Sequence, residues 1–241
     1  MTASDSAAPS PPTPPAPPTS PTSPTEFQRL LRAQKVWDVD LPDFDPAAAP
    51  PAPVDLFQRW FADAVAAGQP EPHTMTLATA GPDGDPDART VMLHDADDEG
   101  WHFASHATSA KGSQLAARPR AALHFYWPAR ARQIRLRGPV RTAPHNEALA
   151  DLHARSTGAL AAALVGRQSE ILPSYAELTR ASDAAWERAR AEPDADAPSW
   201  TLYVLVPQEV EFFQGDARRR HVRLRYRATP NGSWVRELMW P

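Results

Sequence analysis

The sequence contains no cysteine, which excludes disulfide bonds, thiol nucleophiles, cysteine-ligated zinc and iron–sulfur clusters. No apolar run approaches the length needed to cross a bilayer. The first residues also lack the basic and apolar segments of a signal peptide. The net charge of -4 provides no general attraction to nucleic acids or anionic membranes. We therefore expect a cytoplasmic protein that binds neither nucleic acid nor membrane.

Lysine is nearly absent as well, because only Lys35 and Lys111 occur among the 25 basic side chains. Proline is concentrated at one end, with half of the 28 prolines in residues 1–53. Residues 9–24 alternate Pro with Ser, Thr and Ala, and they have too few apolar side chains to offset the entropy of ordering. We predict a disordered Pro-rich N-terminal tail and linker over residues 1–53 and a folded domain over residues 54–241. Residues 27–45 are mixed and could pack on the domain or close over a site.

The domain begins with helical spacing and continues with short strands. One apolar stripe, which ends at Gly68, consists of Leu56, Phe57, Trp60, Phe61, Ala64 and Val65. The expected strands are residues 74–80, 89–95, 100–105, 121–127, 132–140, 200–206, 208–213, 221–227 and 233–238. Helices are expected over residues 109–117, 144–165 and 174–192. Short, closely spaced strands with a few helices predict a mainly β fold, a β-barrel decorated by helices.

Two neighbouring segments carry polar residues that could bind an anion. In residues 89–94 (RTVMLH), alternation separates Arg89 from His94 on the two faces of a strand, an ordinary pattern by itself. In residues 105–112 (SHATSAKG), a strand ends and a helix begins, with Lys111 in the first turn. Free N–H groups at a helix N-terminus and a nearby lysine favour a bound phosphate. A solvated lysine beside a helix cap explains the segment equally well.

A third segment, residues 218–226, places Arg219, His221, Arg223 and Arg225 on one strand face. Such a face can bind a phosphate or carboxylate and stabilise an electron-rich ring. The pattern alone favours the solvated face of an antiparallel strand.

Residues 118–141 contain seven arginines around the aromatic run 125–127, a combination found in surfaces for single-stranded nucleic acid. The negative net charge and the strict alternation of arginine with Ile134 and Leu136 favour a half-buried strand pair instead. The histidines lie on different expected elements, so we predict no metal site.

In their order along the chain, these segments resemble the pyridoxamine 5'-phosphate oxidase family, from about Val54 onward. The matching pieces are Leu56–Trp60, the Arg89 strand, the Ser109–Lys111 turn, Arg132–Gln133, Arg167–Ser169, Glu211–Gly215 and Arg219-x-His221-x-Arg223. The resemblance implies an FMN-binding split β-barrel of the α+β type that forms a homodimer with FMN at the subunit interface. It also implies an FMN-dependent oxidase that removes a hydride from a small ring substrate and passes the electrons to O2.

The resemblance assigns roles to individual residues. Arg89 and Lys111 would bind the FMN phosphate and Gln133 the isoalloxazine ring, whereas Gln168, Ser169, Phe213 and Arg223 would reach the cofactor from the partner subunit. Further cofactor contacts are expected from Val91, Met92, Leu93, His94, Ala104 and Ser105. The catalytic residues would be Arg219 and His221, which hold the substrate over the flavin, and His94 and Arg155 would complete the substrate site.

Three of the four positions expected to bind a substrate phosphate depart from the family pattern. His94, Asp151 and Ala159 stand where a lysine, a tyrosine and a serine are typical, and only Arg155 matches. Residues 105–112 and 164–170 are similar to the flavin oxidases of phenazine biosynthesis, a sister group that lacks the full phosphate clamp.

Three hypotheses therefore remain open. They are a vitamin B6 phosphate oxidase, a phenazine-type oxidase of a non-phosphorylated ring, and a flavin-binding protein without turnover. The retained Arg219 and His221 argue against the third hypothesis. A deazaflavin-binding relative is disfavoured, because such relatives generally lack the C-terminal Arg-x-His-x-Arg pattern.

Overall fold

The computed structural model describes residues 24–37 and 41–241, and the chain forms two compact units, Met1–Val36 and Trp37–Pro241. Nearly all of the predicted disordered tail, residues 9–24, lies outside the described residues. The first unit contains α1 (Glu26–Ala33), a helix that the sequence analysis did not predict. It begins with a capping box in which the Thr25 and Gln28 side chains accept hydrogen bonds from each other's backbone N–H.

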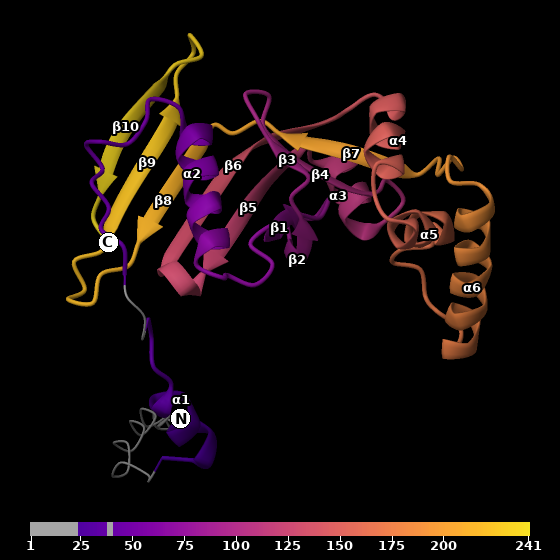
Figure 1. Cartoon of the computed structure of the whole chain (residues 1–241), viewed down its shortest axis with the longest axis horizontal. Helices are drawn as coiled ribbons and strands as arrows, with labels where there is room; N and C mark the ends of the chain where they lie inside the picture. The colour runs from indigo at the N-terminus through magenta and orange to yellow at the C-terminus, as the bar shows by residue number, and fades with distance from the viewer. Residues whose placement is uncertain (1–23, 38–40) are drawn as a thin grey trace, which may run out of the picture. The chain divides into compact units, whose positions relative to one another are not determined.

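The second unit is built on one curved antiparallel sheet (Figure 1). Its strands are β1 (Thr74–Ala80), β2 (Pro86–Met92), β3 (Asp95–Ala96), β4 (Trp101–His106), β5 (Arg120–Trp127), β6 (Arg132–Thr142), β7 (Trp200–Leu205), β8 (Glu209–Gln214), β9 (Val222–Ala228) and β10 (Trp234–Met239). The main path runs β10-β9-β8-β6-β5-β1-β2, and β7 joins β6 to the β4–β3 pair. A short 3-10 turn, η1 (Pro128–Arg130), connects β5 to β6. This arrangement confirms the prediction of a mainly β split barrel with helices.

The core lies between α2 (Pro53–Ala66) and one face of the sheet. Alternation along the strands sends Phe125, Ile134 and Phe212 to this face, and all three side chains are fully buried. Phe57 and Trp60 of α2 pack edge-on against Phe125 and Phe212, with ring centroids 5.0 and 5.2 Å apart. The opposite face of the same strands is therefore left to polar side chains.

Strand β6 holds the two parts of the sheet together. Its residues 132–137 pair with β8, whereas residues 140–142 pair with β7. Between the two sections stands Gly138, where an added Cβ would lie 2.0 Å from the carbonyl oxygen of Val206. Only glycine permits this approach, so this position lets one strand change neighbours along its length.

Helices cover the other end of the unit (Figure 1). They are α3 (Ala110–Ala117), α4 (His145–His153), α5 (Thr157–Val165) and α6 (Tyr175–Ala191). Leu152, Leu160 and Ala189 form a small second core here. The alanines of α5 and α6 therefore supply small side chains that are buried between the helices.

The structure corrects three details of the predicted elements. Residues 144–165 form two helices, because Ser156 caps a new helix by accepting a hydrogen bond from Ala159 N. Strand β2 lies three residues earlier than predicted, since its register with β1 is set by the tight turn at residues 81–85. Arg219 is in a turn with φ 64° before β9, and so does not share a strand face with Arg223 and Arg225.

Residues just before the predicted domain start also contact the domain. Phe44 packs edge-on against Trp60 with ring centroids 5.0 Å apart, and the Tyr226 hydroxyl donates a hydrogen bond to Pro50 O at 2.8 Å. The division at residues 53 and 54 stays a prediction. Among residues 24–37 and 41–241, we find no helix that is long and apolar enough to cross a membrane.

We predict that Leu136→Ala lowers the free energy of unfolding by about 2–5 kcal/mol, because it leaves a cavity in the core. Leu136 is 0% exposed. Leu172→Ala removes the same atoms from a side chain that is 48% exposed, so this control should change stability by less than about 1 kcal/mol. Urea titration of both variants measures the difference, and equal losses would contradict the assignment of Leu136 to the core.

Candidate functional site

The first group of predicted residues surrounds Lys111, in the first turn of α3. Lys111 Nζ donates hydrogen bonds to Ser105 Oγ at 3.1 Å, to Gln168 Oε1 at 2.9 Å and to Ser109 Oγ at 3.5 Å. Ser169 Oγ accepts a hydrogen bond from Ala110 N at the start of α3. We call Ser105, Ser109, Lys111, Gln168 and Ser169 the Lys111 cluster.

Lys111 is a buried cation whose hydrogen-bond acceptors are all neutral oxygen atoms. The residue is 8% exposed, and burial, followed by the nearby charge of Arg89, lowers the pKa of its ammonium group. Within the described part of the chain, we find no carboxylate in an ion pair with it. A buried charge of this kind requires compensation, and a bound anion would provide it.

Arg89 lies on β2 near the Lys111 cluster and is held by its own set of partners. Its guanidinium pairs with Asp87 and donates to Gln114 Oε1 at 3.0 Å and to Thr79 Oγ1.

A pocket of about 450 Å3 opens beside Lys111. Of the predicted site residues, its lining includes Val91, Met92, His94, Ala104, Ser105, Lys111 and Gln168. Leu93 packs against the hydrophobic core instead.

The second group lies on the polar face of the sheet, on β6, β8 and β9. Gln133 is directly opposite Phe213, and Phe213 is directly opposite Arg223, so the three side chains share one face. They line a separate pocket of about 340 Å3 together with Glu211. We call Gln133, Glu211, Phe213 and Arg223 the Arg223 cluster.

Glu211 fixes the orientation of Arg223. Its carboxylate accepts hydrogen bonds from Arg223 Nε and from Arg135 Nη2, both at 2.8 Å. Burial raises the pKa of Glu211, but the hydrogen bonds and charges of Arg223 and Arg135 outweigh it and hold the pKa below its usual value of 4.5. The remaining Arg223 Nη1 donates to Trp240 O at 2.9 Å.

The turn between β8 and β9 presents Arg219 and His221. The backbone N–H of Asp216 donates a hydrogen bond to His221 Nδ1 at 3.0 Å. Because Nδ1 accepts this bond, the proton of the neutral ring resides on Nε2, which can donate to a ligand.

Trp37 packs on this turn. Its ring meets the His221 ring edge-on with centroids 5.0 Å apart, and the guanidinium of Arg219 lies 5.9 Å from the indole centroid. Trp37 has a left-handed backbone with φ 55°, and its buried Nε1 has no hydrogen-bond partner in the described part of the chain. The Trp37 indole N–H is therefore an unsatisfied buried donor beside two predicted substrate ligands.

His94 and Arg155, the other predicted substrate ligands, both contact Asp151. His94 Nδ1 lies 3.0 Å from Asp151 Oδ2, and Arg155 binds the same carboxylate through two nitrogen atoms. His94 also lines the pocket beside Lys111.

The structure thus assembles the predicted residues into two groups rather than one. Gln168 and Ser169 contact Lys111 and Ala110 of their own chain, and the expectation that they reach the cofactor from the partner subunit stays a prediction. The sequence analysis did not identify Asp87, Gln114 or Trp37 as members of the site. These residues are recognisable only from contacts between separate elements.

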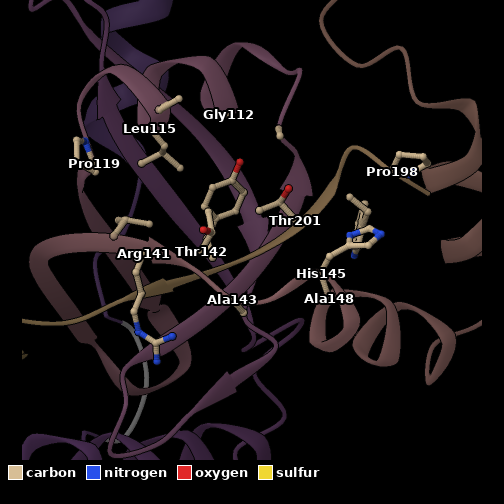
Figure 2. A pocket seen from close by; sticks show the side chains of 15 residues that line it. Gly112, Leu115, Pro119, Arg141, Thr142, Ala143, His145, Ala148, Pro198 and Thr201 are labelled. Atoms are coloured by element: carbon tan, nitrogen blue, oxygen red, sulfur yellow. The ribbon is translucent and has the colours of Figure 1, made fainter. Parts of the chain in front are cut away.

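A larger pocket, of about 610 Å3, lies between α3, β6, α4 and β7 (Figure 2). None of the predicted site residues lines it. Arg141 and His145 stand on opposite sides of this pocket, and they contact Glu99 and Asp196 respectively. We therefore place the candidate site at the two groups described above.

Comparison with known proteins identifies the family of the chain. Residues 61–212 match the family model described as pyridoxamine 5'-phosphate oxidase, and residues 200–241 match the pyridoxine 5'-phosphate oxidase C-terminal dimerisation region. The chain belongs to the pyridoxamine 5'-phosphate oxidase family. The resemblance is confirmed, and the protein is accordingly an enzyme of the oxidoreductase class.

Relatives of this oxidase family cover most of the chain. The pyridoxine/pyridoxamine 5'-phosphate oxidase of Salinibacter ruber is 41% identical over 78% of this chain and 89% of its own length. The protein of that name from Pseudomonas paraeruginosa is 41% identical over 81% of this chain and 91% of its own length.

Solved structures of the oxidase family share the fold. PhzG from Burkholderia lata 383, in complex with tetrahydrophenazine-1-carboxylic acid, superposes with a TM-score of 0.79. It is 30% identical and covers 84% of this chain and 99% of its own. A pyridoxamine 5'-phosphate oxidase-related, FMN binding protein from Nostoc punctiforme superposes with a TM-score of 0.64 at 20% identity, over 80% of this chain and 100% of its own.

We predict that Glu211→Gln destabilises the protein by roughly 1–3 kcal/mol at neutral pH, because two arginines lose a charged acceptor. The folded-state pKa of Glu211 is lowered, so its ionised form contributes stability above about pH 4.5, and this contribution is lost as the pH falls through the folded-state pKa. The difference between wild type and variant should therefore shrink below pH 4.5 in urea titrations. Glu147→Gln, at an exposed position of α4, should show no such trend. A difference that stays constant with pH would contradict the role given to Glu211.

Proposed function

We propose that the protein is an FMN-dependent oxidase that removes a hydride from a small ring substrate and passes the electrons to O2. The observation that carries this proposal is the Lys111 cluster, a buried lysine with only neutral acceptors at the N-terminus of a helix. Membership of the oxidase family supports the same conclusion.

The residues of the Lys111 cluster fit the phosphate of FMN. Lys111 Nζ supplies a point charge in the first turn of α3, and Arg89 supplies a second positive charge nearby. The Ser105 and Ser109 hydroxyl groups accept hydrogen bonds from Lys111 and donate to Gln168 Oε1 and His106 O, so the two cations are the groups that suit a phosphate with two negative charges. Ser105 and Lys111 line the pocket described above.

The Arg223 cluster suits the ring system of FMN, and we infer that a second copy of the chain brings it to the Lys111 cluster. Within one chain the two clusters line separate pockets. Phe213, Arg219, His221 and Arg223 all lie within residues 200–241, the segment that matches a dimerisation region. A homodimer would therefore contain two composite sites, with the phosphate held by one protomer and the ring by the other.

FMN would supply the redox chemistry by taking up two electrons and delivering them to O2. The chain's own residues position the substrate. His221 Nε2–H would donate a hydrogen bond to a substrate oxygen or nitrogen, because Asp216 N–H fixes the tautomer. Arg219 would bind an anionic group of the substrate, and the Trp37 ring would limit access of water. Positioning of this kind supplies much of the rate of a hydride transfer.

Two substrate classes have support. The names of the Salinibacter and Pseudomonas relatives favour the 5'-phosphates of pyridoxine and pyridoxamine. The similarity to PhzG, whose structure contains a phenazine carboxylic acid, favours a ring without a phosphate. Retention of Arg219 and His221 argues against a flavin-binding protein without turnover. A cytoplasmic location remains part of the proposal.

We predict that the purified protein is yellow and that Lys111→Met weakens FMN binding by roughly ten- to hundredfold, the scale of a charge-assisted hydrogen bond. Fluorescence titration of the FMN-free protein measures the dissociation constant. Arg180→Met removes one positive charge from an exposed position of α6 and should leave FMN affinity unchanged. A wild-type protein that takes up no FMN, or a Lys111→Met variant with unaltered affinity, would contradict the proposed phosphate site.

We predict that Lys111→Met and His221→Ala each lose most of their activity at an FMN concentration between the wild-type and Lys111→Met dissociation constants. Mixing the two variants should restore activity at that concentration, because the composite site takes one cluster from each protomer. Lys111→Met damages the phosphate half and His221→Ala the substrate half. Random reassociation makes about half of all dimers mixed, and each mixed dimer then has one intact site, so about a quarter of the wild-type activity should return. The assay is O2 consumption with pyridoxamine 5'-phosphate and with a dihydrophenazine as substrates.

The unmixed variants, unfolded and refolded separately, are the controls. If all parts of a site came from one protomer, mixing would restore nothing. Sedimentation of the FMN-loaded protein as a monomer would also contradict the shared site.

A further inference from the structure

Three nitrogen atoms from two elements converge on the carboxylate of Asp151. His94 Nδ1, after β2, donates to Asp151 Oδ2 at 3.0 Å. Arg155, just beyond α4, donates from Nε to Oδ2 at 3.1 Å and from Nη2 to Oδ1 at 2.9 Å. The three side chains are only 7%, 19% and 29% exposed for His94, Asp151 and Arg155. A bidentate guanidinium and a ring N–H that meet at one point form a receptor for a single oxyanion.

The occupant of this receptor is part of the chain. Burial raises the pKa of Asp151, but hydrogen bonds from His94 and Arg155 outweigh it and hold the pKa far below its usual range. Asp151 is therefore ionised at every pH at which the protein would work. An external anion would have to displace it and leave a half-buried carboxylate without its partners, which is costly.

The receptor adjoins the pocket beside Lys111, because His94 lines that pocket. Lys111 and one member of the second receptor, His94, therefore line the same cavity, and the two receptors differ in the charge of their acceptors. The acceptors around Lys111 are neutral, so that receptor can take an external phosphate. The receptor of His94 and Arg155 is already neutralised by Asp151.

We propose that Asp151 is a built-in counter-anion that excludes phosphate esters from the part of the pocket lined by His94, so that the substrate is a ring compound without a phosphate there. This inference rests on the proposed function and selects the second of its substrate classes. The physical reason is that a substrate phosphate would meet a fixed negative charge, while the adjacent guanidinium of Arg155 is already paired with that charge.

A purely structural role for the same contacts makes a different prediction. The ion pairs also attach α4 to the end of β2, so removal of Asp151 should lower stability in either case. Only a counter-anion, when removed, creates new affinity for a phosphate. Anion selectivity therefore separates the two roles, whereas stability alone does not.

The test compares 4-deoxypyridoxine with its 5'-phosphate, because neither has the C4' hydroxyl or amine at which oxidation would start. Dissociation constants are measured by calorimetry on the FMN-loaded wild type, Asp151→Ala and Asp151→Asn. The asparagine variant keeps the shape and removes only the charge, so it serves if the alanine variant does not fold. Glu147→Gln, an exposed position on the same helix, is the matched control for loss of one negative charge.

We expect the wild type and Glu147→Gln to bind the two compounds with affinities within about threefold of each other. Asp151→Ala should bind the 5'-phosphate roughly ten- to hundredfold more tightly than the wild type does, with little change for 4-deoxypyridoxine. Asp151→Asn should change in the same direction by a smaller factor.

Two results would overturn the inference alone, in a protein that carries FMN. One is a wild type that prefers the 5'-phosphate by more than about tenfold, and the other is a pair of folded Asp151 variants with unchanged selectivity. A wild type that takes up no FMN would instead overturn the proposed function, and the inference with it. The absorbance spectrum of each sample shows which case applies.

Discussion

The architecture depends on the close approach of β6 to the β7–β8 connection at Gly138, where a Cβ would lie 2.0 Å from Val206 O. This contact lets one strand pair with β8 over its first half and with β7 over its second half. β8 carries Phe213 and Glu211, whereas β7 holds β4, which leads to Ser105 and α3. A side chain at residue 138 would force the two halves apart, and with them both groups of the candidate site.

The sequence was sufficient for the parts of the fold that depend on periodicity. Alternation along the strands and the apolar stripe of α2 follow directly from burial on one face, so most elements were predicted within a few residues. The break at Ser156 and the turn at Arg219 were missed, because each depends on a local hydrogen bond rather than on a repeat. Helix α1 was missed although Phe27, Leu30 and Leu31 recur at helical spacing, because residues 27–45 were interpreted as one mixed segment.

The sequence was sufficient to predict which cationic side chains belong to the candidate site, but not which side chains form hydrogen bonds with them. Arg89, Lys111 and Arg223 stand out in the sequence through motif order. Their hydrogen-bond partners, such as Gln114 and Gln168, are distant in sequence and are brought near only by the curvature of the sheet and the packing of helices. For the same reason, the sequence could identify His94 and Asp151 as departures from the family pattern and Arg155 as a match, but it could not show that the three side chains bind one another.

The buried charge of Lys111 couples the folding of the chain to its ligand. The unliganded chain retains an ammonium group among neutral oxygen atoms, and the lowered pKa reflects the unfavourable free energy of that arrangement. Any anion that binds there relieves it, so the free energy of unfolding rises with the logarithm of anion concentration above the dissociation constant. The thermal stability of the protein thus becomes a measure of how much cofactor its surroundings contain.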